Sequence, residues 1–270
     1  MADQLNSLSM AGVAASLAAA MGIEAPAQAQ PAIDQIVNMV KRGTDGGHVD
    51  RVFMYNPDAV AMWLYQKYTT LFDDVVKHTS LAVPLQTVMP SVTPVCFGTM
   101  YTGAYPAVHG IQKYEKPVIR IDTLFDALIR AGKKPVIIGD PHCSLSHIFL
   151  ERDMDYFTAD TIEAINKKAM ALIEEDKYDF YVVYNGNYDS LMHKFGPESD
   201  EAMAQLRDNI ASFDRLITAL RQKWTRHDTL FAFATDHGCH EIDGNCGSHG
   251  LDMPEDLNVI HHYGLIPRSR

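Results

Sequence analysis

The chain has 270 residues, of which 47% are hydrophobic and 21% are charged, with a formal net charge of −11. This composition is typical of a globular protein with one large α/β domain or two small ones, and the excess of acid argues against binding to a nucleic-acid polymer. Only four cysteines are present, so we expect free thiols and a cytoplasmic protein rather than a disulfide framework.

The apolar stretch 10–23 is the candidate for a targeting or membrane segment. It is too short and too rich in alanine to span a membrane. It resembles the core of a signal peptide, with 27–29 as a cleavage-like site, but no Lys or Arg precedes it. We therefore interpret it as part of an amphipathic helix and expect no membrane partner.

The first fifty residues are expected to form a helical extension, with helices at 3–22 and 31–42. After it, short apolar runs alternate with amphipathic segments, a pattern that indicates buried strands separated by helices. The expected strands are 51–56, 135–140, 179–184 and 229–235, and the expected helices between them are 59–68, 122–134, 160–176 and 199–222.

This alternation predicts an α/β fold with a mainly parallel central sheet and helices on both of its faces. One domain is expected to cover 51–270, with 1–50 as the N-terminal helical extension. In sheets of this kind, ligands bind beyond the carboxyl ends of the strands. Side chains that directly follow the strands are therefore the candidates for a functional site.

Acidic and imidazole side chains follow three of the expected strands. Asp189 and His193 are four residues apart, which places them on one face of a helical turn. A solvated pair, a helix cap or an ordinary turn would explain any one group, but three groups at one sheet edge favour a metal centre. Such a set can hold two divalent cations, with Zn²⁺ as the first candidate and Mn²⁺ or Mg²⁺ as alternatives. The candidate ligands are Asp58, Asp189, His193, Asp236, His237 and His249.

A hydroxyl nucleophile is expected in the segment 89–111, where a Pro-rich turn precedes a helical start that contains threonine and glycine. Thr93 lies in this turn, and a threonine hydroxyl beside a divalent cation can lose its proton and attack phosphorus. The N-terminus of the following helix would add backbone N–H groups that bind an anion. Ser91 is the alternative nucleophile.

Four motifs occur in a fixed order along the chain. The first is P-S-V-T-P-(x)7-T-G-(x)2-P-(x)2-H-G, which begins at Pro90, and it is followed by D-(x)3-H, D-H-G and G-x-H-G. Together they resemble the alkaline phosphatase superfamily, most closely its type I phosphodiesterase/nucleotide pyrophosphatase branch. The resemblance covers about residues 51–260 and implies a three-layer α/β/α fold with a minimal cap.

The resemblance also implies a role for each motif residue. Thr93 would be the nucleophile and would form a covalent phospho-enzyme, which water would then hydrolyse. One metal ion would be held by Asp58, Thr93, Asp236 and His237, and the other by Asp189, His193 and His249.

Two departures from related patterns concern these roles. Where the family usually has a strand ending in Asp-Gly, this chain has Asn-Pro-Asp-Ala at 56–59, and the Asp is the only acidic residue within 54–63. In the related sulfatases the nucleophile is a converted Cys or Ser followed by Arg. Counting back from the T-G pair places Thr93 rather than Cys96 in the nucleophile position, and Phe97 stands where the Arg would be. Cys96 is therefore expected to pack in the core.

Several other polar side chains have both a functional and a structural interpretation. Asn185 and Asn187 precede a candidate ligand and could donate to a phosphoryl oxygen, although turn formation is the simpler explanation. Lys113 and Lys116 could contact a substrate phosphate, although a solvated surface pair is the simpler explanation. The remaining candidates are His109, expected to be structural, His142 and His147, which could line the substrate mouth, and Cys239 and Cys246, expected to be free thiols.

These patterns predict a two-metal phosphoester hydrolase that acts on a small phosphorylated substrate. The resemblance favours phosphodiester or nucleotide-like pyrophosphate substrates, and a phosphomonoesterase or phosphonate hydrolase with the same core is the alternative. A non-catalytic metal-binding or sensor protein is the alternative from another class, and a structural subunit without metal is the third. The sequence leaves open whether the chain forms a homo-oligomer.

Overall fold

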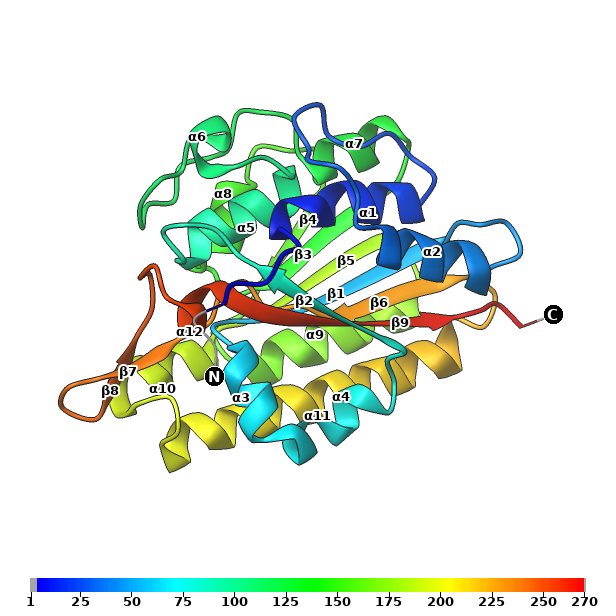
Figure 1. The fold of residues 1–270 in the computed structure, drawn as a ribbon. Helices are drawn as coiled ribbons and strands as arrows, with labels where there is room; N and C mark the ends of the chain where they lie inside the picture. Colours follow the sequence, from blue (N-terminus) through cyan, green and yellow to red (C-terminus); the bar gives the residue numbers. More distant parts are fainter. Residues whose placement is uncertain (1–3, 270) are drawn as a thin grey trace.

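The computed structural model describes residues 4–269. Its centre is a seven-stranded sheet with helices on both sides (Figure 1). The strands of this sheet are β1 (Arg51–Pro57), β2 (Leu81–Gln86), β3 (Pro135–Gly139), β4 (Asp155–Thr158), β5 (Phe180–Asn185), β6 (Thr229–Phe233) and β9 (Asn258–Ile266). They lie in the order β2-β9-β6-β1-β5-β3-β4.

Most of the sheet is parallel. β1 pairs in parallel with β5 on one side and with β6 on the other, and β3 pairs in parallel with β5 and β4. β9 runs antiparallel to both of its neighbours, β2 and β6. The prediction of a mainly parallel α/β sheet is confirmed, and the continuous apolar runs of its central strands follow from burial on both faces.

The helices form two layers around this sheet, and alternate residues of β1 enter different cores. Val52 and Met54 belong to one core, whereas Phe53 and Tyr55 belong to the other. The layer above the sheet in Figure 1 contains η1 (Met10–Gly12), α1 (Val13–Ala20), α2 (Asp34–Gly43), α5 (Thr93–Thr102), α6 (Pro106–His109), α7 (Leu124–Arg130) and α8 (Ser144–Ile148). The layer below contains α3 (Met62–Lys67), η2 (Thr69–Phe72), α4 (Asp73–Val76), α9 (Ile162–Glu175), α10 (Asn187–Phe195) and α11 (Asp200–Lys223).

Two short elements complete the chain beyond β6. β7 (His240–Ile242) and β8 (Cys246–Ser248) form a separate antiparallel hairpin, and α12 (Pro254–Leu257) leads into β9. Within residues 4–269, no helix is both long and apolar enough to cross a membrane.

The N-terminal segment differs from the expected helix over 3–22, whose first residue lies outside the described residues. Residues 4–9 contain no helix, and Ser9 forms a parallel bridge to Gln86 at the end of β2. The Gln86 N–H donates to the Leu8 carbonyl at 2.7 Å. α1 is buried on nearly all sides instead of being amphipathic, because its alanines let α2, α5 and α7 pack against it.

β9 is a long strand that the sequence pattern did not indicate. It contains His261 and His262. Both imidazoles are buried, and His261 Nε2 lies 2.7 Å from the Thr235 carbonyl. The two histidines interrupt the apolar run of the strand, so its burial between β2 and β6 was not apparent from local sequence.

The carboxyl ends of β1, β5 and β6 lie side by side, as the sequence predicts. The Asp58 N–H, just after β1, donates to the carbonyl of Asn185, the last residue of β5, at 3.0 Å. The next N–H, that of Ala59, donates to Oδ1 of Asp236 beyond β6 at 3.2 Å. Ala59 has a φ of 62°, in the left-handed region that favours glycine, so an Asp-Gly pair would suit this turn.

Candidate active site

Three of the predicted ligands form a buried group at this sheet edge, which we call the deep cluster: Asp58, Asp236 and His237. His237 Nε2 lies 3.3 Å from Asp58 Oδ1 and 3.3 Å from Asp236 Oδ2. The three side chains are at most 2% exposed. They follow β1 and β6 directly, so two neighbouring strands at the centre of the sheet hold this cluster.

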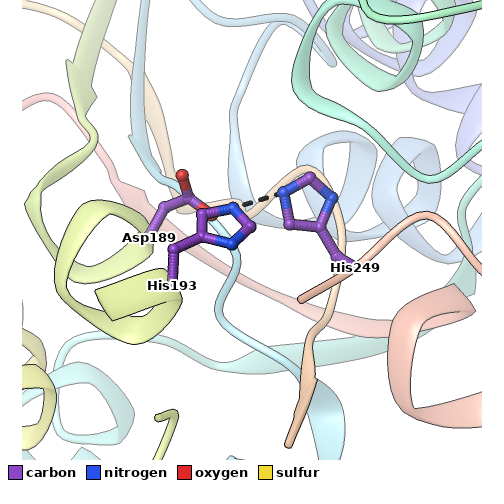
Figure 2. A group of neighbouring side chains, drawn as sticks. All are labelled: Asp189, His193 and His249. Atoms are coloured by element: carbon purple, nitrogen blue, oxygen red, sulfur yellow. Dashed lines mark ion pairs between the residues drawn. The ribbon is translucent and has the colours of Figure 1, made fainter. Parts of the chain in front are cut away.

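The other three predicted ligands form a group nearer the surface, the outer cluster: Asp189, His193 and His249 (Figure 2). Asp189 Oδ1 lies 3.3 Å from Nε2 of His193, one turn later in α10, and 3.5 Å from Nε2 of His249, in the loop after β8. The His193 side chain is 43% exposed. A helix and a loop therefore hold this cluster, and solvent reaches one of its ligands.

The two clusters adjoin each other and Thr93. The rings of His237 and His249 are stacked with their centroids 4.0 Å apart. Thr93 Oγ1 lies 3.4 Å from His237 Nε2 and 3.5 Å from Asp58 Oδ2. The fold thus brings together all seven residues that the sequence suggested as nucleophile or metal ligands.

Backbone carbonyls orient the three imidazoles of these clusters. In each ring Nδ1 donates to a carbonyl oxygen, which can only accept, so Nδ1 carries the proton and Nε2 presents a lone pair. This is the arrangement that orients metal-binding histidines in proteins. The pairs are His193 with Gly247 at 3.0 Å, His237 with Gly238 at 2.9 Å and His249 with Ser91 at 2.8 Å.

The carboxylates present lone pairs to the same space. Asp58 Oδ1, Asp189 Oδ1 and Asp236 Oδ2 are buried and have no hydrogen-bond partner within residues 4–269. These are the oxygens that lie nearest the imidazole Nε2 atoms, so when the carboxyl groups are ionised, acceptors face acceptors in both clusters. Such an arrangement is unfavourable without a cation between the atoms. The mixture of imidazole and carboxylate donors therefore fits one divalent cation in each cluster.

Burial shifts the protonation of the deep cluster. It raises the pKa of Asp236 to about 8, and it raises the pKa of Asp58 well above its usual value, with the charges of Asp236 and Asp189 adding to the effect. Burial also lowers the pKa of His237 to about 3, so that imidazole is neutral at pH 7. A neutral imidazole is the form that binds a metal ion.

Thr93 is the first residue of α5, a helix of 10 residues. Val92 before it is extended, and Pro94 occupies the first turn, where the missing N–H of proline costs no helical hydrogen bond. The Val95 and Cys96 N–H groups both donate to the Val92 carbonyl at 3.0 Å, so the Thr93 N–H and the helix dipole are what favour negative charge at this end. An anion beside the Thr93 hydroxyl would therefore be stabilised by the start of α5.

A pocket of about 250 Å³ opens onto Thr93 and contains one ligand from each cluster, Asp58 and Asp189. Lys116 is the only Lys or Arg among its described lining residues, and its Nζ donates to the His142 carbonyl at 2.6 Å. The pocket lining also includes Tyr114, Asp140, Asp160 and Tyr184, which the sequence motifs did not single out.

The suggested substrate contacts are divided between the inside and the outside of this pocket. Asn187 lines it, and its Nδ2 donates to Gln205 Oε1 at 3.1 Å. Asn185 is fully buried and donates to neighbouring side chains instead. Lys113 is not among the lining residues, and it pairs with Glu115 at 3.3 Å.

His109 and Cys96 have the structural surroundings that the sequence suggested. His109 Nε2 lies 3.1 Å from Thr99 Oγ1 in α5, and its Nδ1 accepts from the Ile111 N–H at 3.3 Å, so it connects α5 to the loop after α6. Burial lowers the pKa of His109 to about 4. Cys96 is buried, and the Thr87 hydroxyl donates to its Sγ at 3.1 Å.

The remaining candidates are His142, His147, the cysteines and Ser91, and only some of them line the pocket. His142 lines the pocket, whereas His147 lies outside its lining and places Nε2 2.9 Å from the Pro141 carbonyl. All four cysteines are free thiols, as expected. Ser91, the alternative nucleophile, is fully buried, and its hydroxyl has no hydrogen-bond partner in the described part of the chain.

Tyr184 contacts the deep cluster, although the sequence gave it only as the end of a buried strand. Its hydroxyl donates to Asp58 Oδ2. Phe97 of α5 packs edge-on against its ring, with the centroids 5.8 Å apart. The available signal was chemical: a tyrosine hydroxyl at the end of a buried strand needs a hydrogen-bond partner.

A larger cavity of about 760 Å³ lies between α9 and α11 and contains none of the cluster residues. It shares Thr161, Ile162 and Asn187 with the smaller pocket. We place the candidate active site at the smaller pocket, because Thr93 and one acidic residue of each cluster, Asp58 and Asp189, line it.

Parallel strands between two helical layers, with paired Asp/His clusters beyond their carboxyl ends, are the architecture of the alkaline phosphatase superfamily. The model of one of its families, type I phosphodiesterase/nucleotide pyrophosphatase, matches residues 56–118 and 120–261. The chain belongs to this family of phosphoester hydrolases. No curated protein matches the sequence.

Solved structures share the fold at low sequence identity. Human ectonucleotide pyrophosphatase/phosphodiesterase 5 is 17% identical with a TM-score of 0.59, and the match covers 72% of this chain and 58% of that chain. The murine protein of the same name is 16% identical with a TM-score of 0.58 and the same coverage. The chain thus spans less than two thirds of the length of these relatives, and the likeness to them concerns the fold.

Proposed function

We propose that this protein hydrolyses phosphoric esters with Thr93 as nucleophile and two divalent cations, one in each cluster. The observation that supports this most strongly is the convergence of two acceptor-only clusters beside Thr93 Oγ1. Zn²⁺ is the favoured ion because imidazole and carboxylate are its usual ligands, and Mn²⁺ or Mg²⁺ are the alternatives. Bound there, the cations would help to ionise the hydroxyl and would offset charge on the phosphoryl oxygens.

The chain's own residues position the reactants. Oγ1 of Thr93 forms a bond to phosphorus as the bond from phosphorus to the leaving oxygen breaks, which gives a phosphoryl ester of Thr93 and a free alcohol or phenol from an ester, or a free phosphate from a pyrophosphate. The hydroxyl proton has an acceptor in Asp58 Oδ2, 3.5 Å away, because Nε2 of His237 would be bound to the cation. The Thr93 N–H and the positive end of the α5 dipole would bind a nonbridging oxygen, because Pro94 has no N–H and the Val95 and Cys96 N–H groups donate to the Val92 carbonyl. Water then attacks phosphorus, releases the phosphoryl product and restores the threonine hydroxyl.

The substrate that we propose is a small phosphodiester or a nucleotide-like pyrophosphate. A pocket of about 250 Å³ with one lysine suits a compact anionic compound. One similar structure, with 17% identity and a TM-score of 0.58 over 72% of this chain and 59% of that chain, is the murine protein in an inactive threonine-to-alanine form in complex with AMP. The AMP in that complex supports a nucleotide-like substrate for this chain, and the inactive threonine-to-alanine form supports an essential threonine.

The test is turnover of the zinc-loaded protein on p-nitrophenyl phosphate, bis-p-nitrophenyl phosphate and p-nitrophenyl sulfate. We expect cleavage of the phosphodiester, reduced to the background rate in Thr93→Ala. A preference for the monoester would support the phosphomonoesterase alternative. Absence of turnover on every ester, with two zinc ions bound, would contradict the hydrolase proposal and favour a non-catalytic metal-binding protein.

We also propose that the protein is cytoplasmic. All four cysteines are unpaired, and free thiols persist in a reducing compartment. Recovery of the protein mainly outside the cytoplasmic fraction of its source cells would contradict this location.

A further inference from the structure

The carboxylate of Asp58 has two oxygens with different partners. Oδ2 accepts a hydrogen bond from the hydroxyl of Tyr184, in the neighbouring strand β5. Oδ1 has no hydrogen-bond partner among the described residues and faces His237 Nε2 at 3.3 Å. The tyrosine thus holds one oxygen and leaves the other directed at the deep cluster.

The Tyr184 ring is held in place by burial and by packing against another aromatic ring. The residue is only 7% exposed, and Phe97 packs edge-on against it at an interplanar angle of 78°. A tyrosine hydroxyl beside a carboxylate oxygen acts as the donor, because the oxygen can only accept.

Gly186 leaves the space that the tyrosine hydroxyl occupies. Its φ is −98°, which any residue can adopt, so glycine is not needed here for backbone conformation. A Cβ at this position would lie 2.6 Å from the Tyr184 hydroxyl oxygen and 3.1 Å from two of its ring carbons. Glycine at 186 is therefore explained by contact with the tyrosine.

We propose that Tyr184 is a positioning residue for the deep cluster: its hydroxyl orients Asp58 toward the cation, and Gly186 makes room for it. This inference rests on the proposed two-metal site. Hydrogen-bonded partners of metal ligands fix ligand orientation, and their loss typically weakens metal binding by about 10–100-fold. Here the partner secures Asp58, the ligand that lies within the Asn-Pro-Asp-Ala sequence at 56–59.

The first experiment is Tyr184→Phe, with Zn²⁺ affinity measured by competition with a chelator. The phenyl ring keeps the packing against Phe97 and removes only the donor. We expect zinc binding at the deep cluster to weaken about 10–100-fold, with the outer cluster unchanged. Repeating the measurement in a His249→Ala background isolates the deep cluster. The matched control is Tyr181→Phe, a buried tyrosine of the same strand whose hydroxyl donates to the Leu172 carbonyl at 3.1 Å.

A second variant reaches the same hydroxyl without changing the tyrosine. Gly186→Ala places a methyl group against it, so deep-cluster affinity should fall, whereas Gly46→Ala, where a Cβ meets no atom within 4 Å, should have no effect. In the double variant with Tyr184→Phe, the alanine should cause less further loss than it does alone, because the displaced hydroxyl is already absent. The visible spectrum of the Co²⁺-loaded protein should change in both single variants.

The possible outcomes distinguish a failure of the role of Tyr184 from a failure of the proposed two-metal site. Two bound zinc ions in the wild type with unchanged deep-cluster affinity in Tyr184→Phe would overturn the role of Tyr184 alone. Equal losses at both clusters would indicate a general structural effect and would also overturn it. A wild-type protein that binds no zinc at the deep cluster would overturn the metal site and this inference together.

Discussion

The deep and outer clusters use the same ligand types but are held by different kinds of backbone. Asp58 and Asp236 follow adjacent parallel strands, and a backbone N–H beside one of them donates to the other. Asp189 and His193 lie on α10, and their partner His249 lies in a loop after the β7–β8 hairpin. One cluster is part of the sheet, whereas the other exists only while a helix and a hairpin remain in contact.

That contact depends on a close approach at Gly247. The His193 ring donates to the Gly247 carbonyl, and a Cβ at this glycine would lie 2.3 Å from the sulfur of Met192 in α10. A cation at the deep cluster would therefore be held by a rigid, buried site, whereas a cation at the outer cluster would be held by a site that solvent and local motion can reach.

The largest effect is expected from Thr93→Ala, which removes the group beside both clusters. Turnover of bis-p-nitrophenyl phosphate should fall by about 10³-fold or more, because the group that attacks phosphorus is lost. Both cations should remain, because each cluster keeps its Asp and His ligands. Steady-state kinetics and metal analysis of the same samples provide the measurement. Full activity in Thr93→Ala, or its loss in the control Ser91→Ala, would reject the nucleophile assignment.

Asp236→Asn should empty the deep cluster while the outer one stays filled. The amide has nearly the shape of the carboxylate but lacks its charge, so zinc content should drop from two ions per chain to one. Turnover should fall by about 100-fold or more, since a direct ligand matters more than the partners of ligands. Zinc stoichiometry measured on the purified variant is the test, and loss of both ions would remove the distinction between the clusters.

His249→Ala is the reciprocal change in the outer cluster. We expect loss of the outer cation, retention of the deep one and a fall in turnover of at least about tenfold. The control is His147→Ala, since His147 lies outside the pocket and bonds a backbone carbonyl. Unchanged metal stoichiometry in His249→Ala, measured beside this control, would remove His249 from the ligand set.

Ala59→Gly should have the smallest effect. Glycine relieves about 1–2 kcal/mol of left-handed strain, but it costs about 0.5–1 kcal/mol in chain entropy and loses a buried methyl worth about 0.8 kcal/mol. The free energy of unfolding, measured with urea, should therefore change by less than about 1 kcal/mol, with zinc affinity unaltered. A large loss of deep-cluster zinc would show that the alanine itself shapes the site.

Much of the site could be predicted because it obeys local rules. Asp58, Asp236 and His237 directly follow strands whose apolar runs are apparent from the sequence, and parallel strands place their carboxyl ends at one edge. Asp189 and His193 are one helical turn apart, so their common face follows from the spacing. The order of the motifs then identified the family, and the match over 56–118 and 120–261 confirms it.

What could not be predicted depends on contacts between distant parts of the chain. Tyr184 meets Asp58 across 126 positions, and nothing near Tyr184 in the sequence indicates this partner. β9 is defined by pairing with β2 and β6, which its histidines obscure in a local pattern. The expectation of a helix over 4–9 was wrong, because Ser9 pairs with Gln86 at the end of β2, and this partner is likewise remote in sequence.

The place of β9 in the sheet has a consequence for how the protein is made. Among the described strands of the main sheet, β2 pairs only with β9. Its last residue, Gln86, pairs with Asn258, the first residue of β9, which is synthesised much later. During synthesis the five parallel strands can therefore assemble before β2 has its partner strand. His249 emerges only shortly before that strand. The outer cluster would therefore be complete only after all five parallel strands have been synthesised.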